Sequence, residues 1–391
     1  MIMRCFSATS SYGPCLALFT ALAFASPAQA GGGAAIVGIV PADVQSRMER
    51  AADWQLAHPF TKCPPTDWIN AAFYAGLLAL ADTSPDSRYL DAMVKIAEGN
   101  GWRLGPLPFH ADDHCVGQAY AELYLKDPKP ERIAPMRASF DHIIANPRDH
   151  NFEFDKEKNP TRLERWSWCD SLFMAPPAFA RLWKATGEVR YLEHAVTNWW
   201  ATSDFLYDRE EHLYYRDSNF FARREANGAK VFWARGNGWV MGGLVRMLQL
   251  LPGDHPSRPR FERQFREMAA KIITCQQPDG FWRASLLDPA SFPAKEASGT
   301  GFYTYALAWG MNRGLLDRAT YASAALRGWA ALVSCQEADG RIVHIQPVAG
   351  SPKNFPEDST MPYGVGAFLL AGSEIYRLAG GSLVEQPPSS K

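Results

Sequence analysis

The sequence lacks an excess of charge of either sign. Its 391 residues include 40 Lys and Arg against 41 Asp and Glu, which gives a formal net charge of −1. No block rich in Lys or Arg stands out along the chain. Because nucleic-acid binding depends on basic surfaces that meet the phosphates, we expect no nucleic-acid partner.

Long hydrophobic runs are also lacking. After the first thirty residues, no stretch of about 18 apolar residues runs without a charge, so we expect no transmembrane helix and no membrane partner. The first thirty residues combine Arg4, an apolar segment over residues 15–25 and an A-x-A pattern at residues 28–30. This combination is typical of a secretory signal peptide, so we expect residues 1–30 to be removed and the mature protein to be exported.

Spacings that mark metal, disulfide and nucleophile sites are missing. Removal of residues 1–30 leaves an odd number of cysteines, none in C-x-x-C spacing, so at least one thiol must stay unpaired. The segment "HADDH" at residues 110–114 is not part of an H-E-x-x-H pattern, and no G-x-S-x-G elbow or phosphate loop occurs. We expect no metal site and mostly buried, reduced cysteines at the remaining positions: Cys63, Cys115, Cys169, Cys275 and Cys335.

What the sequence does have is a recurring unit. An apolar helix rich in Gly, Ala and aromatic residues is followed by an amphipathic helix, and we count this unit six times. Amphipathic partners begin, for example, at Ser87, Val189 and Ala319, and two of them end alike, in "CQQPDGFW" and "CQEADGRI". The apolar helices begin near Asp67, Asp112, Asp170, Asn237, Thr300 and Tyr363.

This alternation predicts the architecture. Helices that are apolar nearly all round must be enclosed, whereas amphipathic helices can face water on one side. We therefore predict an all-α (α/α)6 toroid, an inner ring wrapped by an outer ring, as a single domain over residues 31–391. The loops before the inner helices would then meet at one end of the ring and form one pocket.

Asp170 stands in "RWSWCDSLFM", directly before the third apolar helix. Its plainest role is a helix N-cap, because a carboxylate at a helix start is stabilised by free N–H groups. The flanking Trp166 and Trp168 favour a sugar-binding surface instead, with Asp170 as a catalytic acid.

Asp112 and Asp113 head the second apolar helix in the same way, and only one of the two can cap it well. If either approaches Asp170, repulsion and burial should raise one pKa.

"FWARGNGWVMGG" places Arg235 and Trp239 at the entrance of the fourth apolar helix. The planar fork of an arginine can bind a substrate carboxylate through two hydrogen bonds. An arginine that holds a neighbouring loop explains the motif equally well.

These segments resemble those of the unsaturated rhamnogalacturonyl hydrolases of glycoside hydrolase family 105, with the unsaturated glucuronyl hydrolases of family 88 as relatives. "ADDHCVGQAYAELY", "WSWCDSLFM", "FWARGNGWVMGGLVRML" and "EASGTGFYTYALAWG" occur in family order. The resemblance makes Asp170 the general acid and base, and one of Asp112 and Asp113 the second carboxylate, with Asp112 favoured. The resemblance also places Trp168, Arg235 and Trp239 on the substrate; we add Trp68, at the first inner-helix entrance.

One segment departs from the family. Many members have a His in a "YHG"-like segment where this chain has "LYYRDSNFF", with Arg216. Arg216 could face an acidic or hydroxyl-rich part of the substrate, or could form an ion pair with Asp217.

The reaction that the resemblance implies is hydration of a 4,5-unsaturated uronic acid at the non-reducing end of a lyase-generated oligosaccharide. This reaction requires no metal or organic cofactor, and a short imported substrate favours the periplasm as its location. Two alternatives stay open: an unsaturated glucuronyl hydrolase acting on another glycan, and a glycan-binding toroid without catalysis. The joint presence of Asp112, Asp170 and Arg235 argues against the second, since binding by ring stacking needs no acid.

Overall fold

The computed structural model describes residues 38–383, and their regular secondary structure is almost entirely helical. The predicted signal peptide, residues 1–30, lies outside the described residues. The inner helices are buried on nearly every side: α2 (Trp68–Ala81), α4 (Ala111–His114) with α5 (Gly117–Lys126), α7 (Ser171–Met174) with α8 (Pro176–Thr186), α10 (Ala234–Leu248), α12 (Ala297–Asn312) and α14 (Pro362–Leu378). The outer helices bury one face only: α1 (Pro41–Ala57), α3 (Arg88–Gly99), α6 (Ala134–Ala145), α9 (Val189–Leu206), α11 (Arg258–Cys275) and α13 (Arg318–Val333).

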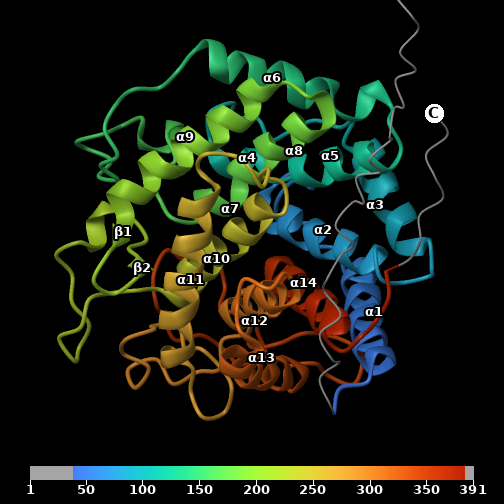
Figure 1. The fold of residues 1–391 in the computed structure, drawn as a ribbon, viewed down its shortest axis with the longest axis vertical. Coiled ribbons are helices and arrows are strands. Elements are labelled where there is room, and N and C mark those ends of the chain that lie inside the picture. Colours follow the sequence, from blue (N-terminus) through green and yellow to red (C-terminus); the bar gives the residue numbers. More distant parts are fainter. Residues whose placement is uncertain (1–37, 384–391) are drawn as a thin grey trace, which may run out of the picture. The chain divides into compact units, whose positions relative to one another are not determined.

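The inner helices form a closed ring. Helix α2 packs against α5, α5 against α8, α8 against α10, α10 against α12, and α12 against α14, which returns to α2. In Figure 1 the outer helices α9, α6, α3, α1 and α13 surround this ring. The described residues therefore form the predicted (α/α)6 toroid.

Closure of the ring differs from the prediction in one detail. Within residues 38–383 no helix follows α14, so the last apolar helix lacks a C-terminal amphipathic partner. That place is taken by α1, which precedes every inner helix in sequence and packs against α14 (Figure 1). The prediction of six units that each run from apolar to amphipathic helix is thus wrong for the sixth, because the two ends of the chain share one unit.

Two inner positions hold broken helices. Helix α7 ends at Met174, and α8 begins with Pro176 and Pro177, whose rings lack the N–H that would continue the first helix. Helices α4 and α5 are separated at Cys115 and Val116, which keep right-handed helical backbone angles. Each broken position thus carries a short helix of four residues at the entrance of the ring.

The two similar segments after α11 and α13 fold alike, which confirms the internal repeat. The N–H of Gly280 donates to the Gln277 carbonyl at 2.9 Å, and the N–H of Gly340 donates to the Glu337 carbonyl at 3.0 Å. Both glycines have positive φ angles, 86° and 102°, which residues with a side chain rarely adopt.

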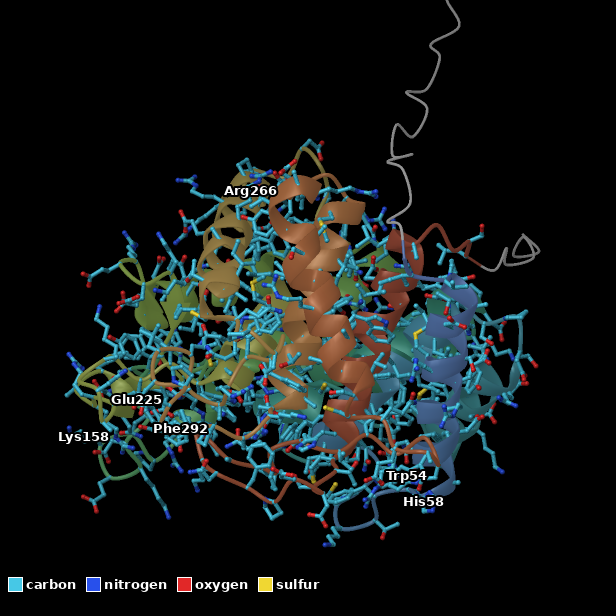
Figure 2. All side chains as sticks on the ribbon, turned by 90° about the horizontal axis from the view of Figure 1, so that it is seen from below. Trp54, His58, Lys158, Glu225, Arg266 and Phe292 are labelled. Carbon is cyan, nitrogen blue, oxygen red and sulfur yellow. The ribbon has the colours of Figure 1, made fainter. Side chains whose placement is uncertain are left out.

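The short elements lie in the connections. Strands β1 (Tyr207–Asp208) and β2 (Leu213–Tyr214) form an antiparallel hairpin after α9, and three 3₁₀ turns cover Pro130–Arg132, Arg162–Glu164 and Ser218–Phe220. Figure 2 shows the loops bearing Lys158, Glu225 and Phe292 at the same end as Trp54 and His58 of α1, with Arg266 of α11 far from that end. We call this loop-bearing end the mouth. Among the described residues, no helix is both long and apolar enough to cross a membrane.

Candidate active site

The predicted carboxylates meet at the mouth. Asp112 lies in α4, Asp170 directly precedes α7, and Asp67 precedes α2. The charges of Asp67 and Asp170 both act on Asp112. The prediction that the inner-helix entrances share one pocket is consistent with this convergence of residues from distant parts of the sequence.

Asp170 does not cap its helix. It occupies the N-cap position of α7, but its side chain accepts no hydrogen bond from the helix N–H groups. Its Oδ2 atom instead accepts a hydrogen bond from the Cys169 thiol at 3.4 Å and lies 3.7 Å from Nε of Arg216. Burial raises the pKa of Asp170, and the positive charges of Arg216 and Arg235 partly counteract the rise. The N-cap interpretation therefore fails, which leaves this carboxylate available for chemistry.

Asp112 has fewer partners than Asp170. Its Oδ1 atom is buried without a hydrogen bond, and its Oδ2 atom lies 4.0 Å from Nε2 of His110. Burial and the neighbouring charge of Asp170 raise the pKa of Asp112 to about 8, and burial lowers the pKa of His110 to about 4. A neutral His110 offers no charge to stabilise the carboxylate, so Asp112 keeps its proton near neutral pH.

Asp113 turns away from this pair. Its Oδ2 atom accepts a hydrogen bond from the Leu107 N–H at 2.6 Å, and its side chain occupies the space where a Cβ on Gly105 would lie. The Gly105 N–H donates to the Asp113 carbonyl at 3.0 Å. Asp113 thus holds the preceding loop, and of the two adjacent acids only Asp112 is coupled to Asp170.

Arg216 forms the ion pair that the sequence left open. Its Nη1 donates to Asp217 at 2.7 Å, while its Nε faces Asp170. Its guanidinium also lies 4.6 Å from the ring centre of Phe154. The ion pair with Asp217 is confirmed, but the same side chain also provides positive charge beside the candidate catalytic acid.

Arg235 holds a loop. Its two terminal nitrogens donate to the backbone carbonyls of Gln346 at 2.5 Å and Pro347 at 3.0 Å, and the residue is only 1% exposed. Its guanidinium lies between the rings of Trp233 and Tyr363, at 4.5 and 4.9 Å from their centres. This is the loop-holding alternative, and direct contact of Arg235 with a substrate carboxylate stays a prediction.

The predicted substrate-binding tryptophans differ in how far their rings are exposed. Trp68 is partly exposed at the mouth, stacks on Tyr363 and meets the edge of Trp239, which is fully buried beneath it. Trp168 packs against His110 at the mouth and is nearly buried. Among these predicted ligands, only Trp68 presents a partly open ring.

Trp166 does not join Trp168 around a sugar. It packs against Phe179 and His194, on the outer side of the inner ring. The expectation that both tryptophans flank the substrate is wrong for Trp166, because residues two apart in an irregular segment point in different directions.

Two neighbours of the site carried no recognised signal in the sequence. Phe154 comes from a stretch without regular secondary structure, yet its ring contacts both Arg216 and Trp168. Cys169 is one of the cysteines expected to be buried and reduced, and its thiol donates to Asp170. Only the position of Cys169 directly before the acid could have drawn attention to it.

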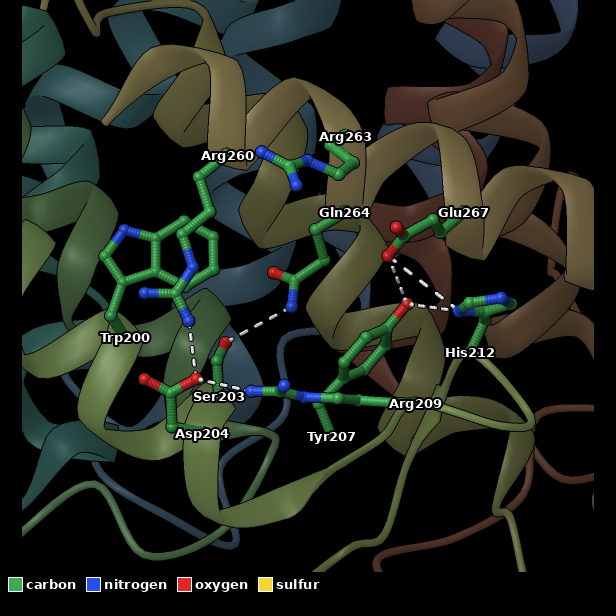
Figure 3. A pocket seen from close by; sticks show the side chains of 10 residues that line it. All are labelled: Trp200, Ser203, Asp204, Tyr207, Arg209, His212, Arg260, Arg263, Gln264 and Glu267. Carbon is green, nitrogen blue, oxygen red and sulfur yellow. Dashed lines mark hydrogen bonds and ion pairs between the residues drawn. The ribbon is translucent and has the colours of Figure 1, made fainter. Parts of the chain in front are cut away.

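A separate pocket of about 340 Å³ lies between α9 and α11, away from the inner-helix entrances (Figure 3). Its charged groups largely satisfy one another, as Asp204 pairs with Arg260 and Arg209, and the Tyr207 hydroxyl donates to Glu267.

Among residues 38–383, no group of three or more His, Cys, Asp or Glu is arranged to hold a metal. All five described cysteines are free and four are buried, as expected.

The family model that matches this chain is Glycosyl Hydrolase Family 88, over residues 41–379. An unsaturated 3S-rhamnoglycuronyl hydrolase of Formosa agariphila is 38% identical over 349 residues, covering 87% of this chain and 92% of that protein. A protein of the same name from an Alteromonas species is 35% identical, covering 84% of each chain. The solved structure of a glycosyl hydrolase family 88 protein from Bacteroides vulgatus superposes with a TM-score of 0.79 at 29% identity, covering 87% of this chain and 100% of that one.

These matches cover most of the described chain. The family model spans nearly the whole toroid, including the segments that carry Asp112 and Asp170. The matches support the predicted reaction, in which an unsaturated uronic acid is removed from an oligosaccharide end. The chain belongs to Glycosyl Hydrolase Family 88 and is a glycoside hydrolase.

Proposed function

We propose that this enzyme hydrates a 4,5-unsaturated uronic acid joined to a rhamnose residue at the non-reducing end of lyase-generated oligosaccharides. The observation that carries the proposal is the coupled pair Asp112 and Asp170, whose side chains are 20% and 13% exposed at the mouth. The choice of rhamnose follows the names of the two curated relatives, which specify a 3S-rhamnoglycuronyl substrate.

In the proposed reaction Asp170 acts first as an acid and then as a base. Electrons from the ring oxygen enter the C4=C5 double bond, and C4 takes the proton of Asp170. Water then adds to C5 and returns a proton to the Asp170 carboxylate. The resulting hemiketal opens and releases the neighbouring sugar, so no direct displacement at the glycosidic carbon is needed.

The charges around Asp170 suit both halves of this cycle. Burial favours its protonated form, and the incoming carboxylate of the substrate adds negative charge that favours it further. Once the proton has left, Arg216 at 3.7 Å stabilises the ionised form. Asp112, with a pKa raised to about 8, stays protonated at neutral pH and adds no second negative charge.

We assign Arg216 to the leaving side of the substrate, opposite an anionic substituent such as a sulfate ester on the rhamnose. Its Nη1 is bound to Asp217, whereas its Nη2 makes no hydrogen bond to any residue of the described chain. Gly350 lies beside this guanidinium: a Cβ there would meet Cζ and Nε at 3.6 Å, an ordinary contact. The guanidinium fork binds oxyanions through paired hydrogen bonds, to tetrahedral phosphate-like groups as well as to carboxylates, which fits this assignment.

The proposed reaction is tested on a panel of lyase-derived disaccharides, followed as loss of the ultraviolet absorbance of the double bond. We expect turnover of rhamnose-linked unsaturated substrates, and no release of reducing sugar from the saturated uronides that serve as the control. Conversion of glucuronyl disaccharides in preference to rhamnose-linked ones would favour the alternative substrate class. Binding of the disaccharides without any loss of absorbance would leave only the glycan-binding alternative.

Arg216→His tests the assignment of Arg216. We expect a relative shift of roughly tenfold toward substrates without the anionic group, since a charge-assisted hydrogen bond contributes about 1.5–3 kcal/mol. Arg209→His, at a side chain that is 81% exposed, is the matched control and should leave the ranking unchanged. Unchanged relative activities together with a lower melting temperature would reduce Arg216 to a structural partner of Asp217.

We also propose that the enzyme works after export, in the periplasm. The support is the A-x-A pattern that ends at Ala30 after an apolar segment. N-terminal sequencing of the protein from a periplasmic fraction tests this, and an intact Met1 there would contradict it.

A further inference from the structure

We propose that Cys169 is a positioning residue that orients Asp170 through a thiol hydrogen bond, so that one defined carboxylate oxygen faces the substrate. The inference rests on the proposed reaction at Asp170 and adds a residue that supports it. Cys169 precedes Asp170 in sequence and is fully buried, so the thiol acts from behind the acid and not from the mouth.

The two oxygens of Asp170 have different surroundings. The Cys169 thiol donates to Oδ2 at 3.4 Å, and Nε of Arg216 lies 3.7 Å from the same atom. Both contacts therefore hold negative charge on Oδ2. This leaves Oδ1 as the oxygen that gives and takes the proton.

The thiol is held in place by its surroundings. The Cys169 N–H donates to the Arg216 carbonyl at 2.8 Å, so the thiol and the guanidinium are parts of one connected segment. A Cβ on Gly236 would come within 3.0 Å of the Cys169 sulfur, so the glycine leaves room for the thiol.

The thiol also stays protonated. Burial and the negative charge of Asp170 both raise the pKa of Cys169 well above its ordinary value. A thiol that does not ionise can act as a donor throughout the pH range in which the enzyme works, and it is a poor nucleophile.

Cys169→Ala removes the donor without adding bulk. We expect the pH profile of kcat/KM to move to higher pH by about 0.3–1 unit, because the ionised form of Asp170 loses a hydrogen bond. We expect kcat to fall by about 3- to 10-fold with little change in KM, as the acid loses its fixed orientation. Cys169→Ser, which keeps a hydroxyl donor, should restore most of both properties.

Cys335→Ala is the matched control. Cys335 is equally buried, but its thiol donates to the Ala331 carbonyl of α13 at 3.5 Å and is not among the groups that act on Asp112 or Asp170. A profile in Cys169→Ala that matches the wild type, or an equal shift in Cys335→Ala, would overturn the inference. Failure of Cys169→Ser to restore the profile would overturn it too.

These outcomes are separable from a failure of the proposed function. The profiles are compared only over the pH range in which circular dichroism shows each variant fully folded, so a loss of stability is kept apart from the expected shift. If Asp170→Asn retained wild-type turnover, the proposed reaction itself would fall. If Asp170→Asn were inactive and Cys169→Ala kept the wild-type profile, the proposed reaction would stand and only the role of Cys169 would be rejected.

Discussion

The second inner position of the toroid carries two carboxylates with opposite surroundings. At the mouth, Asp112 has a buried oxygen without a hydrogen bond, and its pKa is raised to about 8. Toward the other end of the ring, Glu122 accepts from Nε of Arg181 at 2.5 Å and from Nη2 of Arg246 at 2.6 Å, and these two arginines lower its pKa. Both are largely buried, so the number of cationic partners decides the difference.

The two carboxylates differ in their pKa shifts because their partners differ. A buried acid matched by cations stays ionised and ties helices together, here α5, α8 and α10. A buried acid with too few partners, here Asp112, keeps its proton near neutral pH. This contrast supports the proposal that the reaction takes place at the mouth. At the opposite end, the ion pairs of Glu122 hold inner helices together.

The largest expected effect is at the mouth. Asp170→Asn keeps the shape of the side chain but cannot donate a proton, so turnover should fall by about 10²–10⁴-fold. Circular dichroism should show an unchanged helical fold. A variant with wild-type turnover in the absorbance assay would remove Asp170 from the mechanism.

The second effect is at the opposite end. Glu122→Gln leaves Arg181 and Arg246 without their shared carboxylate, so the free energy of unfolding should drop by about 3–5 kcal/mol. The pH profile of turnover should stay in place, because Glu122 is not part of the mouth. Denaturant unfolding measures the first quantity, and a displaced pH profile would contradict the division between the two ends.

The third effect links the carboxylate at the mouth to stability. A raised pKa means that folding disfavours the ionised form of Asp112. Below the ordinary carboxyl pKa this residue does not lower the free energy of unfolding. Between that pKa and pH 8 it lowers the free energy of unfolding increasingly. Asp112→Asn should therefore raise the melting temperature at pH 8 relative to the wild type, with little change at pH 4.

Glu122 should show the opposite sign. Its lowered pKa contributes stability above the ordinary carboxyl range, and this contribution is lost as the pH falls through the folded-state pKa. Melting curves of wild type, Asp112→Asn and Glu122→Gln at a series of pH values test both signs. An Asp112→Asn variant that is less stable than the wild type at pH 8 would mean that Asp112 is a structural partner.

The sequence by itself determined the architecture and the place of the site. Apolar helices that alternate with amphipathic ones leave few arrangements other than a double ring, because each apolar helix must be enclosed. Helix starts that carry Asp112, Asp170 and Arg235 then place the polar residues at one end. The periodicity of the chain contains this information, so the toroid follows without coordinates.

Only the tertiary structure decided what each polar side chain does. Asp112 and Asp113 are adjacent and chemically identical, yet one binds the Leu107 N–H and the other lacks a partner for one oxygen. Arg235 binds the Gln346 carbonyl, which lies more than a hundred residues away along the chain. The physical reason is that pKa values and hydrogen bonds depend on distances of a few ångströms between segments remote in sequence, and no local pattern specifies those distances.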